Sequence, residues 1–356
     1  MTNEMVSESR NIVDQLPIAA LEEYLAAQVE GFRGPMQVSK FSGGQSNPTF
    51  KLETPSGRYV LRRQPPGKLL KSAHAVDREF RVMRALADSA VPVPRVLHLC
   101  EDRELIGSMF YVMEYCEGRI FWDAALPELD GPRQKNQRAA FYEEMNRVLA
   151  ALHSVDLQTT GLADYGRPGN YFERQFERWQ GQYRASELQP IAAMDRLIDW
   201  LGGHLPPDDG RVALVHGDYR LDNIMFHPTE PRAIAVLDWE LSTLGHPFAD
   251  LAYQCMQLRM PADSGNISGL MGVDREVLGI PSEHEYVARY CERMGIEKID
   301  NWAFYLAFSF FRLAAIIQGV AKRAQDGNAS NKSAARLGAF VEPLAQLALD
   351  VIEKEY

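Results

Sequence analysis

The residues best suited to chemistry in this sequence are two carboxylates and an amide beside short apolar segments. Asp218 lies in His216-Gly-Asp-Tyr-Arg-Leu-Asp-Asn223, five residues before Asn223, and Asp238 lies in Val236-Leu-Asp-Trp239. The apolar stretches 224–226 and 234–237 are predicted to pair as a hairpin, which places Asp238 beside the segment of Asn223. We therefore expect the three side chains to converge on one edge.

Phosphoryl transfer is the reaction that uses such a set of side chains. One carboxylate orients the attacking hydroxyl and accepts its proton, while an acid and an amide hold magnesium against the phosphates. Asp218 is predicted to be the base, and Asn223 and Asp238 the metal ligands. Asp and Asn also favour turns, which is the simpler explanation for a single Asp. Three residues in this order favour the chemical interpretation.

The two segments resemble the kinase catalytic loop H-x-D-x-x-x-x-N and the metal-binding D-F-G motif. In their local form, H-G-D-x-x-x-x-N with D-W, they resemble the aminoglycoside phosphotransferase family, which includes relatives of choline, homoserine and fructosamine kinases. Trp239 stands where kinases have Phe, and Glu240 where they have Gly. The resemblance implies ATP and Mg²⁺ as cofactors. It also implies a bilobal protein-kinase-like α+β fold, with a small β-sheet lobe containing one key helix and a larger, mostly helical lobe.

Kinases also pair a strand cation with a helix acid to grip the nucleotide phosphates. Arg62, in a strand predicted over 59–63, stands where kinases have Lys, and a guanidinium differs in reach from an ammonium. Glu79 lies on the apolar stripe of a helix predicted over 73–88, where a carboxylate is costly unless paired. Arg62 is the predicted partner and Arg63, on the other strand face, the alternative. Glu79 could instead be solvated between its basic neighbours.

Two further segments match the positions of nucleotide contacts in kinases. The loop 42–47 stands where the phosphate-covering loop lies, although it lacks the G-x-G-x-x-G spacing and also suits a plain hairpin turn. The segment 113–116 stands where the adenine-binding hinge lies, and it also suits an ordinary strand end. The residues predicted to bind nucleotide here are Gly43, Gly44, Ser46, Asn47, Met113, Glu114 and Cys116.

Two residues are predicted to support the catalytic loop. The resemblance assigns Asp250, in His246-Pro-Phe-Ala-Asp250, to holding this loop from below. His216 is predicted to be a packed, hydrogen-bonded histidine, because no second His or Cys stands near it at the spacing of a zinc site.

The acceptor pocket is expected between the catalytic loop and the helices at 165–205. Tyr171, Gln175 and Trp179 share one helical face there and could line the pocket. A stripe of this kind is more often simply core, and that alternative is favoured.

The acceptor is predicted to be small. Eleven residues separate Asp238 from Asp250, where protein kinases have a long activation segment and an A-P-E motif for docking peptides. The segments 59–67, 91–94 and 238–247 resemble the kinase-like domain fused to some acyl-CoA dehydrogenases. That branch is linked to phosphorylating hydroxyacyl compounds, so the acceptor is expected to be a hydroxyacyl compound or, less favoured, an aminoglycoside-like alcohol.

The composition is that of a globular protein, and the length suggests two lobes, which are predicted as 1–115 and 116–356. The chain has 356 residues, 46% hydrophobic, and a formal net charge of −10, which argues against nucleic-acid binding. Its four cysteines lack close spacing and the chain opens on no secretory signal, so a cytoplasmic location is expected. The apolar stretch 302–320 contains Arg312 and Gln318 and is predicted to be a buried core helix rather than a membrane span.

A second class of function stays open. The chain could be a nucleotide-binding pseudokinase that acts as a scaffold or sensor, and the Arg at position 62 is the only sequence support for that alternative.

Overall fold

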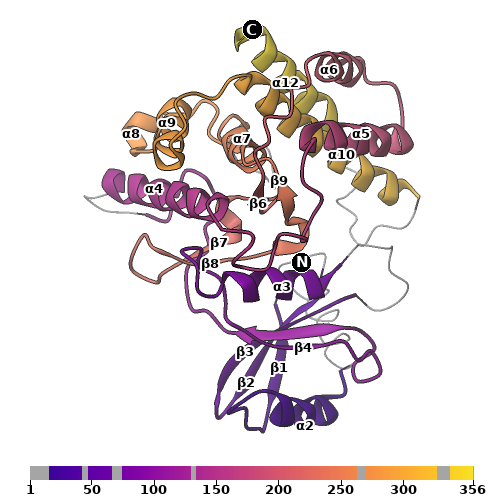
Figure 1. The fold of residues 1–356 in the computed structure, drawn as a ribbon, viewed down its shortest axis with the longest axis vertical. Coiled ribbons are helices and arrows are strands. Elements are labelled where there is room, and N and C mark those ends of the chain that lie inside the picture. Colours follow the sequence, from indigo (N-terminus) through magenta and orange to yellow (C-terminus); the bar gives the residue numbers. More distant parts are fainter. Residues whose placement is uncertain are drawn as a thin grey trace. The chain divides into compact units, whose positions relative to one another are not determined.

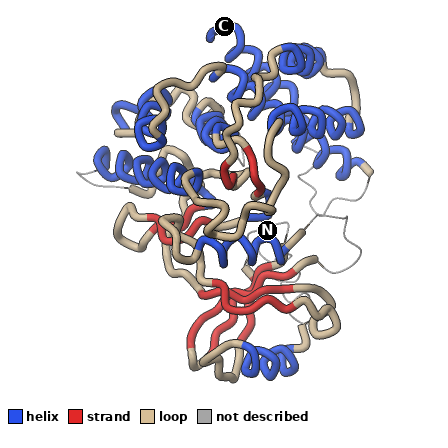
Figure 2. Tube along the Cα trace, viewed as in Figure 1, coloured by secondary structure: helices blue, strands red, loops and turns tan. Residues whose placement is uncertain are grey.

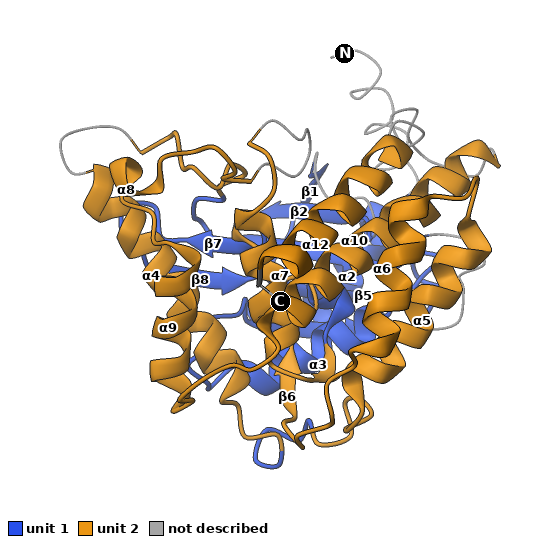
Figure 3. Cartoon of the chain, turned by 90° about the horizontal axis from the view of Figure 1, so that it is seen from above, with its two compact units in different colours: residues 1–120, 158–162, 223–242 blue, residues 121–157, 163–222, 243–356 orange. Residues whose placement is uncertain are grey.

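The computed structural model describes residues 16–41, 47–65, 74–129, 134–262, 269–326 and 337–355. The chain forms two compact units, which are coloured separately in Figure 3. Unit 1 is made of Met1–Ile120, Gln158–Leu162 and Asn223–Ser242, and unit 2 of Phe121–Leu157, Ala163–Asp222 and Thr243–Tyr356. Because neither unit is a continuous stretch, the predicted lobes 1–115 and 116–356 coincide with them only in part.

Unit 1 contains an antiparallel five-stranded sheet with the strand order β1-β2-β3-β5-β4. The strands are β1 (Gln37–Lys40), β2 (Thr49–Thr54), β3 (Gly57–Arg63), β4 (Val96–Cys100) and β5 (Phe110–Glu114). Helices α2 (Ile18–Gln28) and α3 (Val76–Leu86) lie on opposite faces of this sheet (Figure 1). The predicted strand at 59–63 and the predicted helix at 73–88 are both present.

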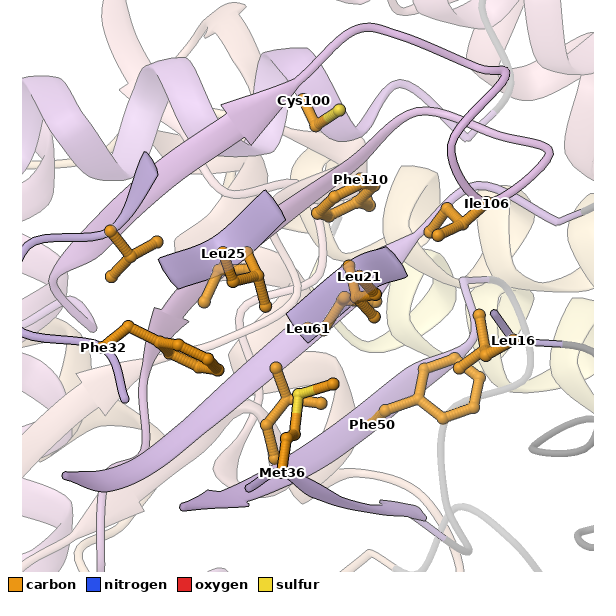
Figure 4. Packing of buried hydrophobic residues seen from close by; sticks show 13 residues of the cluster. Leu16, Leu21, Leu25, Phe32, Met36, Phe50, Leu61, Cys100, Ile106 and Phe110 are labelled. Atoms are coloured by element: carbon orange, nitrogen blue, oxygen red, sulfur yellow. The ribbon is translucent and has the colours of Figure 1, made fainter. Parts of the chain in front are cut away.

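A hydrophobic cluster joins α2 to one face of the sheet (Figure 4). Leu21 and Leu25 of α2 pack in it with Phe50, Leu61 and Phe110 from three strands. Successive side chains of a strand point to opposite faces. Since Leu61 faces α2, its neighbour Arg62 faces α3, and this alternation decides which arginine of β3 reaches the helix.

Unit 1 also includes a hairpin from much later in the chain. Strands β7 (Ile224–Phe226) and β8 (Ala233–Val236) pair antiparallel, as predicted, and Val236 N donates to Pro92 O at 2.8 Å. The short 3₁₀ turn at Trp239–Leu241 follows, and Trp239 is buried with its Nε1 donating to Val236 O at 2.9 Å. The buried indole therefore fixes the backbone that leads out of β8.

Unit 2 is mostly helical, as the coloured tube in Figure 2 shows. Two short strands, β6 (Ala213–Val215) and β9 (Thr243–Gly245), form its small sheet, and β9 was not predicted. Its helices are α4 (Gln134–His153), α5 (Tyr171–Ser186), α6 (Ala192–Gly203), α7 (Phe248–Leu258), α8 (Arg275–Leu278), α9 (Glu283–Met294), α10 (Trp302–Gln325) and α12 (Val341–Glu355).

Helix α10 is the core helix of unit 2. By length and composition it could cross a membrane, but 78% of its most apolar window is buried inside the protein. Core helices of soluble proteins have the same property, so this helix is weak evidence for a membrane span. The prediction of a buried helix over 302–320 is confirmed.

Candidate active site

Arg62 is the centre of a group of charges in unit 1. Its Nε lies 2.8 Å from Glu79 Oε2 and its Nη2 lies 2.5 Å from Asp238 Oδ1, while its side chain is only 11% exposed. Burial acts to lower the pKa of Arg62, but the charges of Glu79 and Asp238 raise it above its ordinary value. The planar guanidinium thus contacts the helix acid and the predicted metal ligand through two different nitrogens. A lysine ammonium has a single nitrogen and could not do this.

Glu79 is buried beneath this guanidinium and, besides the ion pair, accepts two hydrogen bonds. Asn47 Nδ2 donates to its Oε1 at 2.8 Å, and the Tyr111 hydroxyl donates to its Oε2 at 3.1 Å. Burial raises the pKa of Glu79 to about 7, against the opposing effect of Arg62. The solvated alternative for Glu79 is wrong, because its side chain is 1% exposed.

Within the predicted loop 42–47 the structure describes Asn47, while Gly43, Gly44 and Ser46 lie outside the described residues. Asn47 is fully buried, and its Oδ1 lies 3.0 Å from His74 Nδ1. Its amide therefore holds Glu79, a contact that the sequence prediction of a phosphate-binding residue did not anticipate. Tyr111 was missed altogether, although an aromatic hydroxyl on the α3 face of a buried strand is a signal for such a contact.

The predicted hinge stands at the end of β5. Met113 is buried and pairs with Val60 and Val96, and Glu114 N donates to Arg95 O at 2.9 Å. Burial and the neighbouring carboxylate raise the pKa of the Cys116 thiol to about 11. Cys116 is thus protonated at neutral pH and unsuited to be a nucleophile.

Asn223 and Asp238 meet at one end of the β7–β8 hairpin. Leu237 N donates to Asn223 O at 2.8 Å, so the residue after Leu237 leaves the ladder beside Asn223. Asp238 has φ 62° and ψ 59°, a left-handed conformation that Asp adopts more readily than most residues. This backbone turn sends the Trp239 ring into the core and leaves the Asp238 side chain 36% exposed.

The donor set of this hairpin end suits magnesium. A carboxylate and an amide supply the hard oxygens that Mg²⁺ prefers, and Mg²⁺ takes its remaining ligands from phosphates and water. Over the described ranges, no group of three or more His, Cys, Asp or Glu could hold a metal by itself. A site of two protein oxygens that is completed by a nucleotide is consistent with both observations.

The catalytic-loop segment lies in unit 2 after β6. Asp250 Oδ2 accepts from His216 N at 2.6 Å, and Asp250 Oδ1 accepts from Gly217 N at 2.8 Å. The imidazole of His153 lies 3.4 Å from the same carboxylate. Burial opposes ionisation of Asp250, yet the hydrogen bonds and imidazoles around it lower its pKa below the ordinary value. A charged Asp250 therefore holds two consecutive amides just before Asp218.

The contacts of Asp218 in unit 2 include groups from the catalytic loop and from α7. Its backbone N donates to His216 Nδ1 at 3.2 Å, its Oδ1 lies 3.4 Å from Arg220 Nε, and its carboxylate is hydrogen-bonded to the Tyr253 side chain. Burial and this carboxylate raise the pKa of Tyr253 above its ordinary value, so the phenol keeps its proton. Sequence reasoning missed Tyr253 and Arg220. His216 is packed and hydrogen-bonded, with no ligand cluster around it among the described residues.

The α5 stripe predicted for the acceptor is largely occupied by packing. Trp179 is buried and its Nε1 donates to Gln175 Oε1 at 3.1 Å. Tyr171 packs so closely on β9 that a Cβ at Gly245 would lie 2.6 Å from its ring. Tyr171 also borders a cavity of about 220 Å³ with His246 and Tyr305. The contacts of Trp179 agree with the core alternative, while Tyr171 faces open volume.

Known proteins are similar to this chain over most of its length. The model of a family described as the phosphotransferase enzyme family matches residues 37–294. Acyl-CoA dehydrogenase family member 10 of Mus musculus is 51% identical over 341 residues, covering 96% of this chain and 31% of that protein. The chain thus spans about a third of the length of this curated relative.

Solved structures of phosphotransferases are also similar to this chain. The crystal structure of a Ralstonia eutropha protein, assigned as an aminoglycoside phosphotransferase, is 50% identical with a TM-score of 0.85, covering 94% of this chain and 98% of that one. A thermostable mutant of aminoglycoside phosphotransferase APH(4)-Ia, in a ternary complex with AMP-PNP and hygromycin B, is 15% identical with a TM-score of 0.61 over 94% of this chain and 99% of that one. The latter likeness concerns the fold alone. The predicted kinase-like α+β fold is confirmed.

Proposed function

Because the chain belongs to the phosphotransferase enzyme family, we propose that it transfers the γ-phosphoryl group of ATP to a hydroxyl of a small molecule. The observation that supports this most directly is the buried Arg62–Glu79 ion pair, whose guanidinium also contacts Asp238. An ion pair on this strand and helix is the device with which kinases grip the α- and β-phosphates.

Each residue has a separate task in the proposed reaction. Glu79 fixes the Arg62 fork, whose other donors bind phosphate oxygens. Asn223 and Asp238 would hold Mg²⁺, which when bound neutralises charge on the phosphates. Asp218 accepts the hydroxyl proton as the acceptor oxygen bonds to the γ-phosphorus and the bond to the bridging oxygen of ADP breaks. Arg220 and Tyr253 orient the Asp218 carboxylate.

The remaining nucleotide contacts are part of the same proposal. The backbone of Glu114 and Cys116 would bind adenine with Met113 behind it, and the backbone of Gly43, Gly44 and Ser46 would approach the phosphates. Asn47 contributes from behind, since its amide holds Glu79.

A hydroxyacyl compound is the acceptor that we favour over an aminoglycoside. The proposed base lies 3.4 Å from the guanidinium of Arg220 and is hydrogen-bonded to the phenol of Tyr253. Arg220 is also paired with Asp222, at 2.7 Å, so two carboxylates balance its charge and this charge does not decide between a cationic and an anionic acceptor. The similar mouse protein, named as an acyl-CoA dehydrogenase family member, makes acyl compounds a reasonable first class to test.

One observation favours the alternative of a nucleotide-binding pseudokinase. Arg62 lies 2.5 Å from the carboxylate of Asp238, the proposed metal ligand, so this cation competes with Mg²⁺ for an oxygen. A scaffold of this kind would bind ATP equally well with and without magnesium and would not turn it over.

Asp218→Asn tests the proposed function. The variant keeps the size of the side chain but cannot accept a proton, so we expect turnover to fall by about 100- to 10,000-fold while the ATP-dependent rise in Tm is unchanged. Release of ADP from Mg·ATP is measured with hydroxyacyl thioesters, aminoglycosides and water as acceptors.

Two outcomes would contradict the proposal. Wild-type turnover by Asp218→Asn removes this residue from the mechanism. A rise in Tm with ATP that is the same without Mg²⁺, together with no ADP release by the wild type, favours the pseudokinase. A ligand at 100 times its dissociation constant stabilises by about 2.7 kcal/mol, so the shift is measurable.

A further inference from the structure

Arg312 is a charged side chain in the middle of the most apolar helix of unit 2. It lies in α10 and is only 9% exposed. Burying a guanidinium is costly unless its donors and charge find partners. Over the described residues, no carboxylate is found in an ion pair with it. The partners that the structure does show are therefore informative.

Those partners belong to the catalytic loop and to two aromatic rings. Arg312 Nη2 donates to Gly217 O at 2.5 Å. Its guanidinium carbon lies 5.7 Å from the ring centre of Trp179 in α5 and 5.2 Å from that of Tyr253 in α7. Contacts of a cation with aromatic faces stabilise the charge and restrict the orientation of the planar fork.

The contact with Gly217 acts on the peptide that immediately precedes the proposed base. Gly217 has φ 83°, so its peptide has an orientation that other residues rarely adopt. Asp250 binds its N–H from one side, and Arg312 binds its carbonyl from another. Tyr253, whose ring contacts Arg312, is hydrogen-bonded to the Asp218 carboxylate. Backbone and carboxylate of the base are thus both tied to one guanidinium.

We propose that Arg312 is a positioning residue for phosphoryl transfer, which fixes the Gly217–Asp218 peptide and, through Tyr253, the direction of the Asp218 carboxylate. The inference rests on the proposed function. It assigns to α10, which is remote in sequence from the catalytic loop, a part in the reaction beyond core packing.

The test compares full-length variants in the steady-state hydrolysis of Mg·ATP, with water as the acceptor. Arg312→Met removes the donor and the charge but keeps much of the volume. We expect kcat to fall about 10- to 100-fold while KM for ATP changes less than about 3-fold, because the lost hydrogen bond acts on the base and not on the nucleotide. Arg312→Lys, which keeps the charge, should recover part of kcat, and Tyr253→Phe should lower kcat alone.

Arg138→Met is the matched control. Arg138 is also buried, in α4 of the same unit, and donates to the carbonyls of Ala125 and Leu129 rather than to the catalytic loop. Its loss should lower Tm but leave kcat within about 2-fold. If Arg312→Met and Arg138→Met have the same kcat, Arg312 is merely structural and the inference is wrong.

Amide hydrogen exchange of the segment 213–222 gives a readout that does not need activity. Arg312→Met should accelerate exchange at Gly217 and Asp218, whereas Arg138→Met should not. Should the wild type release no ADP with water or with any of the acceptors named above, the proposed function fails, and the exchange rates alone decide whether Arg312 holds this loop. Unchanged exchange in Arg312→Met would overturn the inference in either case.

Discussion

At the scale of single residues, the site depends on buried charged groups that have oppositely charged or hydrogen-bonding partners. Glu79 accepts two hydrogen bonds and pairs with Arg62, Asp250 accepts from two amides, and Arg62 lies between two carboxylates. Breaking one partner of such a group leaves an uncompensated charge, which costs several kcal/mol. The Arg at position 62, where kinases have Lys, is therefore part of a network of charges, since its guanidinium contacts both Glu79 and Asp238.

The pH dependence of stability should report on Glu79. Burial raises its pKa from the ordinary 4.5 to about 7, so the folded chain holds this proton at pH values where the unfolded chain has lost it. The free energy of unfolding should then fall as pH rises from about 4.5 to about 7. Above that range, Glu79 should cause no further change with pH.

Thermal unfolding of the wild type and of Glu79→Gln between pH 4.5 and 8 checks this expectation. Other groups titrate equally in both proteins, so the difference between the two Tm curves isolates residue 79. A difference that does not change with pH would show that Glu79 keeps its charge throughout, held by Arg62.

At the scale of elements, the close contact of α5 with β9 is the most sensitive to volume. Gly245→Ala places a methyl 2.6 Å from the ring of Tyr171 and 2.9 Å from Val215. We expect a loss of about 1–3 kcal/mol in the free energy of unfolding, since overpacking forces neighbours from their rotamers. Denaturant unfolding measures the change.

Gly181→Ala in α5 is the matched control for this substitution. No heavy atom lies within 4 Å of the added methyl, and the position is exposed in the helix interior. Ala is favoured over Gly there by about 0.5–1 kcal/mol, so this variant should be more stable than the wild type. Equal effects of the two substitutions would mean that Tyr171 is not packed on β9.

Many of the helices and strands could be predicted from the sequence, and those that were missed have a physical reason. The hairpin over 224–237 and the helix that bears Glu79 follow from local periodicity and turn residues. Strand β9 was missed because three residues, Thr243 to Gly245, form a strand only through pairing with β6. Likewise, Arg312 was recognised as an interruption of an apolar helix, but its partner Gly217 is 95 residues away and no local pattern indicates that contact.

At the scale of the whole molecule, charge limits the partners. A formal net charge of −10 repels the phosphate backbone of nucleic acids, whose binding depends on clustered cations. We expect no binding of the chain to a fluorescein-labelled 20-base-pair duplex by anisotropy at 150 mM salt and micromolar protein. Binding that disappears at higher salt would reveal a local basic surface that the total charge conceals.

The discontinuous make-up of unit 1 has a consequence for how the protein is produced. The sheet and α3 are synthesised early, but the hairpin β7–β8 and the buried Trp239 belong to the same unit and leave the ribosome only after much of unit 2. A nascent chain that ends near residue 120 therefore lacks part of the unit that it has begun to fold. Expression of the first 120 residues as a short N-terminal fragment should give an unstable product, whereas a fusion that joins 223–242 to these 120 residues should be more stable.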